Sequence, residues 1–459
     1  MSLRGKLVVF WMKHRPRHTD TTQMVALMFA AIILLGTLLL MLPAASRDGL
    51  SCGLRPALFT ATSATCVTGL VLGDTWSMWS GFGQVVILCL IQIGGLGFMS
   101  VATLLIFLLR RKIGLRQRLM IAQSLSVSDI KGVVRLQKLV LTGSFFVEAI
   151  GALILTLRFW PEYGLGKALR WGIFHAVSAF CNAGFDIFGS IAPGQSLTAF
   201  QSDPVVLLTL AALITIGGLG FLVWENIAER RSFSKLSVYT KLVLLMTLAL
   251  LAIGWAGVCL LEWNNPDTLG NMTVGEKLLN GFFQSATLRT AGFAAVDQAK
   301  LTESGKAFSC VLMFIGGSSG STAGGVKTVT FLVLLLTIWG RARGKSTVCA
   351  FKRTIPGEQT QNAMIISFIV LALAIFGGIF VSATSPMGFT DAMYETVSAL
   401  ATVGLSAGGT ASMSLPAQIL IIIYMYFGRV GVLTISLGFL AGDRAEERFR
   451  YADTSLLIG

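Results

Sequence analysis

The chain has 459 residues, of which 54% are hydrophobic and only 13% are charged, and its formal net charge is +14. A soluble globule of this size needs far more polar surface than this composition supplies, so the composition excludes a soluble domain and favours a membrane protein. A net positive charge of this size can indicate a nucleic-acid partner, but the positions of the basic residues argue for membrane topology instead.

Apolar runs that match the thickness of a bilayer recur along the chain. They are Gln23 to Leu42, Phe82 to Leu109, Leu139 to Leu157, Val205 to Trp224, Val238 to Leu261, Lys306 to Trp339, Ala363 to Val381 and Pro416 to Ala441. The first follows a basic arm without a small-residue cleavage site, so we expect a retained span and not a signal peptide. The sequence therefore predicts eight membrane spans, of which the sixth is interrupted.

Most of the 36 lysines and arginines lie in the N-terminal arm, in the loops after the second, fourth and sixth spans, and in the C-terminal tail. This positive-inside pattern predicts that both termini are cytoplasmic. The basic faces can also meet anionic lipid or an acidic partner. The seven cysteines are scattered without paired or metal-ligating spacing, which argues against a disulfide framework or a zinc site.

Four short segments align with one another without gaps. They are Phe59 to Leu70 (FTATSATCVTGL), Phe174 to Phe185 (FHAVSAFCNAGF), Phe282 to Phe293 (FFQSATLRTAGF) and Tyr394 to Leu405 (YETVSALATVGL). Each has an aromatic residue ten positions before a glycine, small residues five and six positions before it, and Leu or Phe after it. A fixed internal period of this kind determines the architecture of a chain.

The aligned glycines are Gly69, Gly184, Gly292 and Gly404, and a second glycine motif follows each of them. The second motifs are IGGLGF at 93–98, IGGLGF at 216–221, IGGSSG at 315–320 and FGRVG at 427–431. Each unit therefore reads as a span, a short segment ending in glycine, and a second span. Ordinary helix-packing glycines of the small-xxx-small kind are the alternative reading.

The short segments are too short to cross a bilayer, so each is expected to be a re-entrant pore helix followed by an extended turn. Four such turns around one axis can coordinate a cation with rings of backbone carbonyls. Glycine is suited to these turns because it adopts a positive φ at little cost. The predicted ion-binding filter comprises Val67, Thr68, Gly69, Asn182, Ala183, Gly184, Thr290, Ala291, Gly292, Thr402, Val403 and Gly404.

The predicted fold is an all-α membrane protein with four tandem helix, pore loop, helix repeats around one pseudo-fourfold pore. Its expected parts are a cytoplasmic arm 1–22, repeat 1 at 23–118 (pore loop 57–73), repeat 2 at 119–235 (pore loop 172–188), repeat 3 at 236–353 (pore loop 280–296, gate loop 316–326), repeat 4 at 354–442 (pore loop 391–408) and a tail 443–459.

These residues resemble the Trk/Ktr/HKT superfamily of potassium transporters, and specifically the KtrB family of membrane subunits of bacterial Ktr systems. The resemblance covers essentially the whole chain, including IQIGGLGFM (91–99) and IGGSSGSTAGGVKT (315–328). Plant HKT proteins that have serine in place of the first filter glycine favour sodium. This chain retains glycine at that position, Gly69, so the resemblance implies potassium permeation. It also implies a homodimer, potassium bound at the carbonyls near the four glycines, a KtrA-type RCK ring that binds ATP or ADP, and transport that often depends on sodium.

The sixth span is broken by ten residues without one large side chain, which cannot form a stable straight helix. A phosphate-binding loop is excluded because the spacing of its lysine motif is missing. The resemblance implies that this loop is a gate beneath the filter, and a passive helix break is the alternative. The predicted gate comprises Gly316, Gly317, Ser318, Ser319, Gly320, Ser321, Thr322, Ala323, Gly324, Gly325, Lys327 and Arg429.

Arg429 lies in the middle of the last span, where an unpaired arginine is costly, so we expect it to face the pore or to pair with gate-loop carbonyls. Lys327 can cap carbonyls or face the cytoplasm. Arg289 is expected to lie behind the filter and to hydrogen-bond the loop.

Other polar residues near the loops have simpler interpretations. Asp74, Asp186 and Asp297 follow filter glycines, where carboxylates can concentrate cations or can merely be solvated. His175 is interpreted as a satisfied buried histidine and not as a proton relay.

Two other classes of function fit the sequence less well. An alternating-access secondary transporter also uses broken helices, but such proteins usually have inverted halves, whereas these repeats share one orientation. An intramembrane enzyme is excluded because the sequence has neither HExxH nor a credible Ser-His pair, and only three histidines.

Overall fold

A computed structural model describes residues 21–97, 132–345 and 347–431 of the chain. The predictions for the N-terminal arm 1–22, for most of the connection between the first two repeats and for the tail 443–459 therefore lie largely or wholly outside the described residues.

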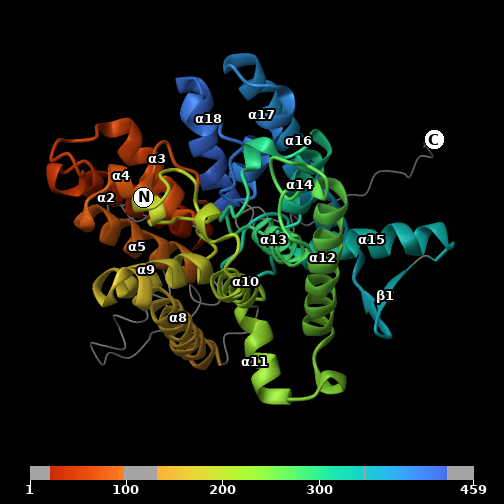
Figure 1. Ribbon diagram of the computed structural model, residues 1–459. Helices are drawn as coiled ribbons and strands as arrows, with labels where there is room; N and C mark the ends of the chain where they lie inside the picture. Colours follow the sequence, from red (N-terminus) through yellow and green to blue (C-terminus); the bar gives the residue numbers. More distant parts are fainter. Residues whose placement is uncertain (1–20, 98–131, 346, 432–459) are drawn as a thin grey trace, which may run out of the picture.

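The described chain is mostly helical, and its helices recur in one order (Figure 1). A long helix, a short helix and a further helix follow one another four times. These triplets are α2 (Thr21–Leu40), α3 (Leu54–Thr65), α5 (Gly81–Leu96); α8 (Val133–Tyr163), α9 (Leu165–Phe180), α10 (Pro204–Gly218); α12 (Val238–Glu262), α13 (Val274–Thr287), α14 (Glu303–Phe314); and α16 (Gly357–Thr384), α17 (Phe389–Leu400), α18 (Leu415–Tyr426). Figure 1 shows the four triplets following one another around a common centre.

The remaining elements connect or extend these helices. They are α4 (Thr75–Met78), α11 (Phe221–Arg230), α15 (Thr328–Ala342), a π-helical turn (Phe427–Gly431), and 3-10 turns at Pro43–Ala45, Phe188–Ser190, Thr198–Phe200, Phe233–Lys235, Gln298–Lys300 and Thr410–Ser412.

Local sequence explains where several helices begin. α13 starts with a capping box, in which Thr273 and Glu276 each bind the backbone of the other. α10 starts with Pro204 at its first position and with Asp203 as the capping residue. Arg158 on α8 donates to Asp203 at 2.6 Å, so this cap also joins α8 to α10.

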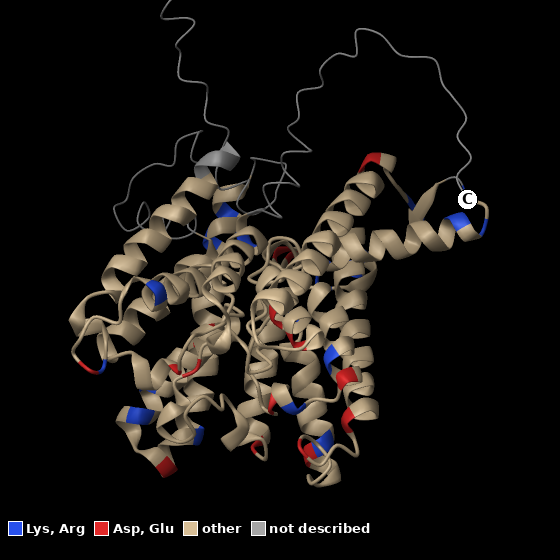
Figure 2. Cartoon of the chain, turned by 90° about the horizontal axis from the view of Figure 1, so that it is seen from above, with Lys and Arg blue, Asp and Glu red and all other residues tan. Residues whose placement is uncertain are grey.

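Three described helices are long and apolar enough to cross a membrane by themselves, namely α8, α12 and α16. Most of the helix surface carries no charged residue (Figure 2). Among the shorter apolar helices, α2 covers most of the first predicted span, whereas α5, α15 and α18 are parts of predicted spans that are broken or that continue outside the described residues.

The fourth predicted span, Val205 to Trp224, is not one straight helix, and this expectation was wrong. α10 and α11 meet at an angle of 90°. Gly220 has a φ of +94° at the break, a conformation that glycine adopts readily. The backbone N–H of Phe221 is freed by the bend and donates to the carbonyl of Gly320 at 2.9 Å. The predicted gate loop thus supplies the hydrogen-bond acceptor for a backbone N–H at the break.

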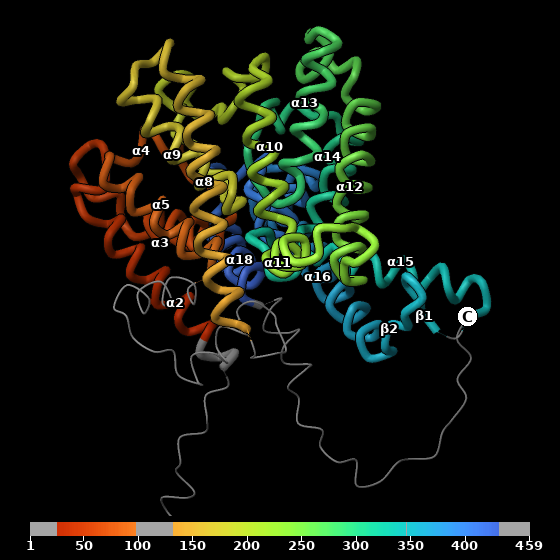
Figure 3. Tube along the Cα trace, turned by 90° about the horizontal axis from the view of Figure 1, so that it is seen from below, coloured from red at the N-terminus to blue at the C-terminus, as the bar shows by residue number. Residues whose placement is uncertain are grey.

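The all-α prediction was also incomplete, because β1 (Val348–Ala350) and β2 (Arg353–Ile355) form an antiparallel hairpin. Its turn residues Phe351 and Lys352 both have positive φ values. α15 and this hairpin project away from the helical body in two views (Figures 1 and 3).

The interior is built from two hydrophobic clusters that meet around the short helices. The aromatic residues ten positions before the glycines contribute directly, since Phe59, Phe174 and Tyr394 are buried. All seven cysteines are free thiols.

Glu262 at the end of α12 is a buried carboxylate held by neutral donors. Its Oε1 accepts from the backbone N–H and the hydroxyl of Thr302 at 3.0 and 2.7 Å, and its Oε2 accepts from Asn265 and Thr268. These contacts join the end of α12 to the start of α14.

We expect Glu262→Ala to lower the free energy of unfolding by about 2 to 4 kcal/mol, because it leaves several buried donors without an acceptor. The midpoint of thermal unfolding in detergent measures this change. Glu303→Ala, which alters an exposed carboxylate in the first turn of α14, is the matched control. Equal midpoints for the two variants would contradict the structural role of Glu262.

Candidate ion pathway

The four short helices α3, α9, α13 and α17 all end in loops with the same backbone conformation. In each loop the aligned glycine and the residue two positions before it are left-handed. The φ values are +56° and +96° for Val67 and Gly69, +58° and +70° for Asn182 and Gly184, +68° and +84° for Thr290 and Gly292, and +51° and +95° for Thr402 and Gly404. The sequences VTG, NAG, TAG and TVG thus fold alike, although a left-handed Val or Thr is strained.

The four loops meet in a closed ring. A β-carbon on Gly69 would lie 2.5 Å from the carbonyl oxygen of Ala183, and one on Gly184 would lie 2.8 Å from that of Ala291. A β-carbon on Gly292 would lie 2.5 Å from the carbonyl oxygen of Val403, and one on Gly404 would overlap that of Thr68. Each glycine therefore approaches the loop of the next repeat, and the fourth approaches the first. The structure thus brings together all twelve residues of the predicted filter.

Hydroxyl groups on the short helices fix these loops. Ser63 and Ser398 each accept a hydrogen bond at 3.0 Å from the backbone N–H of the glycine six positions later. In the other two repeats the hydroxyls of Ser178 and Thr287 donate at 2.7 Å to the carbonyl of the phenylalanine after the glycine. The small residues in the alignment are therefore the anchors of the loops.

The second glycine motif packs against the ends of the same short helices. A β-carbon on Gly94, Gly217 or Gly428 would overlap a carbonyl oxygen four residues before the loop glycine, on Thr65, Phe180 or Leu400 respectively. These positions need glycine because backbone approaches backbone there. The second motif thus brings the second helix of a repeat directly beneath its loop.

The predicted gate loop leaves α14 after Phe314 and reaches α15 at Thr328. It lies against the second repeat, where Ser318 N–H donates to the carbonyl of Gly218 and Thr322 N–H donates to that of Gly217. It also reaches the third filter loop, since the backbone N–H of Gly324 donates to Thr290 Oγ1 at 3.2 Å. The loop is therefore in direct contact with the ring.

Two cations hold the gate loop by its carbonyl oxygens. Arg429 donates to the carbonyl of Thr322 at 2.6 Å and to those of Gly94 and Gly95 at 2.5 and 3.1 Å. Lys327 donates to the carbonyl of Ala323 at 2.8 Å, so it caps the loop. Arg429 thus ties the gate loop to α5 of the first repeat.

Arg289 does not bond the filter loop through its side chain, contrary to the prediction. It is buried, and its guanidinium donates to the carbonyl of Thr247 on α12 at 3.5 Å. The physical reason is that α12 packs along α13 and presents the carbonyl of Thr247 to the guanidinium behind the loop.

His175 is a satisfied buried residue, as the sequence suggested. Its Nδ1 lies 2.7 Å from the carbonyl of Trp171, and its Nε2 accepts from the backbone N–H of Ile187 at 3.2 Å. The ring stacks on Phe188 with a centroid separation of 3.8 Å.

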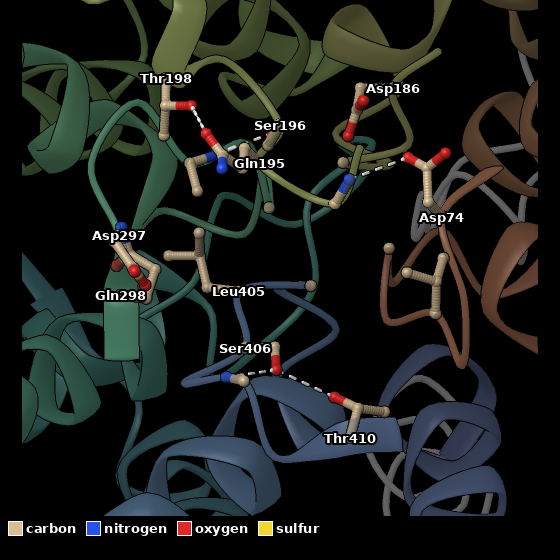
Figure 4. Close-up of a pocket in the computed structure, with 18 of the residues that line it drawn as sticks. Asp74, Asp186, Gln195, Ser196, Thr198, Asp297, Gln298, Leu405, Ser406 and Thr410 are labelled. Atoms are coloured by element: carbon tan, nitrogen blue, oxygen red, sulfur yellow. Dashed lines mark hydrogen bonds between the residues drawn. The ribbon is translucent and has the colours of Figure 1, made fainter. Parts of the chain in front are cut away.

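A cavity of about 550 Å³ adjoins the ring on the side of the segments that follow the four glycines, and we call it the vestibule. Asp74, Asp186 and Asp297 line it (Figure 4). Asp74 and Asp297 also accept backbone hydrogen bonds, from Ser77 and Ala299, so local capping accounts for part of their placement. Burial, reinforced by the charge of Asp74, raises the pKa of Asp186 to about 7.

Several polar residues of the vestibule were missed by sequence reasoning. Gln298, Ser406 and Thr410 line its wall, and Glu395 lies behind it. Glu395 was detectable as an acidic residue within an otherwise apolar pore segment, whereas the other three have no pattern that separates them from ordinary loop residues.

Comparison with known proteins places the chain in a family. The TrkH family model, described as a cation transport protein, matches residues 5–447. The potassium/sodium uptake protein NtpJ of Enterococcus hirae is 39% identical over 98% of this chain and 99% of its own length. The Ktr system potassium uptake protein B of Bacillus subtilis is 38% identical over 100% of both chains, and that of Vibrio alginolyticus is 38% identical over 95% of this chain and 94% of its own.

The potassium transporter TrkH of Vibrio parahaemolyticus has a similar fold, with a TM-score of 0.70 at 16% sequence identity over 94% of this chain and 86% of that one. The chain is therefore a member of the TrkH family of cation transport proteins, and it is a membrane transporter and not an enzyme.

Proposed function

We propose that the chain is the pore-forming subunit of a potassium uptake system of the Ktr type. The closed ring of four glycine loops carries this proposal, because four backbone turns around one axis can surround a cation with carbonyl oxygens. Relatives named as potassium uptake proteins that match the full length of the chain support potassium as the ion.

The proposed filter consists of the three residues in each repeat that end at Gly69, Gly184, Gly292 and Gly404. Potassium binds at the carbonyl oxygens of these loops. Only the fourth repeat keeps the TVG sequence of potassium channels, so the four sides of the pathway differ in chemistry. We therefore propose a looser selectivity than that of a channel with four identical sides.

The loop 316–326, with Arg429 and Lys327, is the proposed gate. The hydrogen bonds from Arg429 to the carbonyls of Thr322, Gly94 and Gly95 hold the loop across the pathway beneath the ring. A cytoplasmic RCK ring that binds ATP or ADP would regulate this loop, and transport would depend on sodium. The subunit would act as a homodimer in the cytoplasmic membrane with both termini in the cytoplasm.

Potassium-dependent growth and potassium flux in cells that lack their own potassium uptake test the proposal. The intact chain and its ring partner should restore both. Restored uptake of a different solute without restored potassium uptake would overturn the pore and would favour an alternating-access transporter.

We expect Gly69→Ser to raise sodium permeation relative to potassium by about tenfold. The added side chain would press on the carbonyl of Ala183 and strain a backbone with a φ of +96°. The ratio of the two uptake rates measures the effect. Gly357→Ser is the matched control, since no atom lies within 4 Å of the added carbon. An unchanged ratio in Gly69→Ser would mean that Gly69 does not line the filter.

Deleting part of Ser318 to Ala323 should raise potassium flux several-fold and reduce its dependence on the ring partner, because the shortened loop cannot reach Thr290 and Arg429 together. Flux with and without the partner measures both effects. Thr322→Val keeps the loop length and removes one hydrogen bond, to Phe180, so its effect should be smaller. A deletion variant that stays partner-dependent would argue against the gate.

Acidifying the outside from about pH 8 to about pH 6 should lower potassium uptake, because a carboxyl with a pKa of about 7 loses its charge over this range. Asp186→Asn should remove this part of the pH dependence. Asp267→Asn changes another carboxylate of the vestibule and should keep it. Identical pH profiles for the wild type and Asp186→Asn would contradict the expectation.

A further inference from the structure

Glu395 on α17 is a carboxylate behind the fourth filter loop, and its side chain is 0% exposed. Its Oε1 accepts from the hydroxyl of Ser406 at 2.5 Å and from the backbone N–H of Gly409 at 3.2 Å. Its Oε2 accepts from the hydroxyl of Thr410 at 2.7 Å, and the backbone of Ala407 is a further donor. All of these donors belong to the segment that follows Gly404.

Within the described residues no lysine or arginine forms an ion pair with Glu395. A buried carboxylate without a cation depends on its hydrogen-bond donors for stability. Asp391, one turn earlier on α17, is instead paired with Lys306 at 2.7 Å. The donors around Glu395 are therefore matched to this one carboxylate and do not belong to a general ion-pair network.

The segment held by Glu395 forms one wall of the vestibule. Ser406, Gly408 and Thr410 line the cavity, and the hydroxyl oxygens of Thr410 and Ser406 lie 3.1 Å apart (Figure 4). On the other side of the loop, Ser398 of the same helix holds the backbone N–H of Gly404. α17 thus fixes the fourth filter loop both at its glycine and after it.

The same position, nine residues before the glycine, has a different residue in each repeat: Thr60, His175, Phe283 and Glu395. His175 performs a related task in the second repeat, because its Nε2 accepts from the backbone of Ile187, three residues after Gly184. In the third repeat the neighbouring Gln284 pairs with Gln298 instead. Among these anchors only Glu395 is a carboxylate, and it binds the largest number of loop groups.

We propose that Glu395 is a positioning residue that sets cation selectivity by holding the segment 406–410, and with it the carbonyls of the fourth filter loop, in the geometry that favours potassium. This inference rests on the proposed function as a potassium pore. It extends the specificity-determining residues from the loops to the helix behind them. The carboxylate acts through its hydrogen bonds and does not touch the ion.

Two substitutions separate the hydrogen bonds of Glu395 from its charge. Glu395→Gln keeps one oxygen to accept from Ser406 and Gly409, and its amide can donate to the hydroxyl of Thr410. Glu395→Ala removes every acceptor and leaves the segment free to shift. The positioning role therefore predicts a large effect for alanine and a small one for glutamine.

The experiment measures potassium and sodium uptake by the full chain with its ring partner in cells that lack their own potassium uptake. Glu395→Ala should raise the sodium-to-potassium uptake ratio by about fivefold, as expected for the loss of a charge-assisted hydrogen bond. Glu395→Gln should change the ratio by less than about twofold. Glu262→Ala is the matched control, because it removes a carboxylate that is equally buried and bound by neutral donors but does not contact a filter loop.

If Glu395→Ala does not reach the membrane, the double variant Ser406→Ala with Thr410→Val removes the hydroxyl donors and should raise the ratio in its place. A wild-type ratio in a folded Glu395→Ala, or in the double variant, would overturn the inference. An equal rise of the sodium-to-potassium ratio in Glu395→Gln and Glu395→Ala would also overturn the inference. Both variants lose the negative charge, so this loss, and not the loss of hydrogen-bond acceptors, would then explain the change in selectivity. If the wild type takes up no potassium, the proposed function itself fails, which is a separate result.

Discussion

A polypeptide backbone at membrane depth must find hydrogen-bond partners within the protein, because lipid offers none. The structure depends on this constraint wherever a helix is broken. The N–H of Phe221, freed by the bend between α10 and α11, binds a carbonyl of the loop 316–326. Carbonyls of that loop in turn bind Arg429, Lys327 and Tyr239. The break in one helix is thus satisfied by the loop that interrupts another, and side chains satisfy the carbonyls of that loop.

The close approach of backbone to backbone follows from the same constraint. Side chains on the ring glycines would push neighbouring loops apart. Side chains at Gly94, Gly217 and Gly428 would separate the second helices from the ends of the short helices. Glycine therefore has two different tasks here, which are a left-handed conformation in the loops and a close contact in the second helices. Both tasks recur from repeat to repeat, although little else in the sequence does.

The repeated features were predictable from sequence because they are imposed by period, length and the special properties of glycine. The four aligned segments and the break in the sixth predicted span are of this kind. The bend at Gly220 belongs to the motif itself, because Gly97, the equivalent glycine of the first IGGLGF, also ends its helix with a positive φ, +81° against +94°. The partner of the freed Phe221 N–H could not be predicted, because the carbonyl of Gly320 lies far away in sequence. The partner of Arg289 was missed for a similar reason, since it lies on α12, far away in sequence. The pairing of Glu395 with Ser406 and Thr410 also depends on a tertiary fold that brings the helix and the loop together.

The helix α15 begins at Thr328, directly after Lys327 and the loop that binds the ring, and its other end carries the hairpin of β1 and β2. Fifteen residues of α-helix form a rod of about 22 Å. This rod extends toward the edge of the molecule (Figure 3), so it connects the hairpin at one end with the loop at the other. A rotation imposed at the hairpin therefore acts on the loop and on α12 together, because α15 packs against α12 and α16 and the ammonium of Lys241 on α12 lies 5.6 Å from the ring centroid of Phe351.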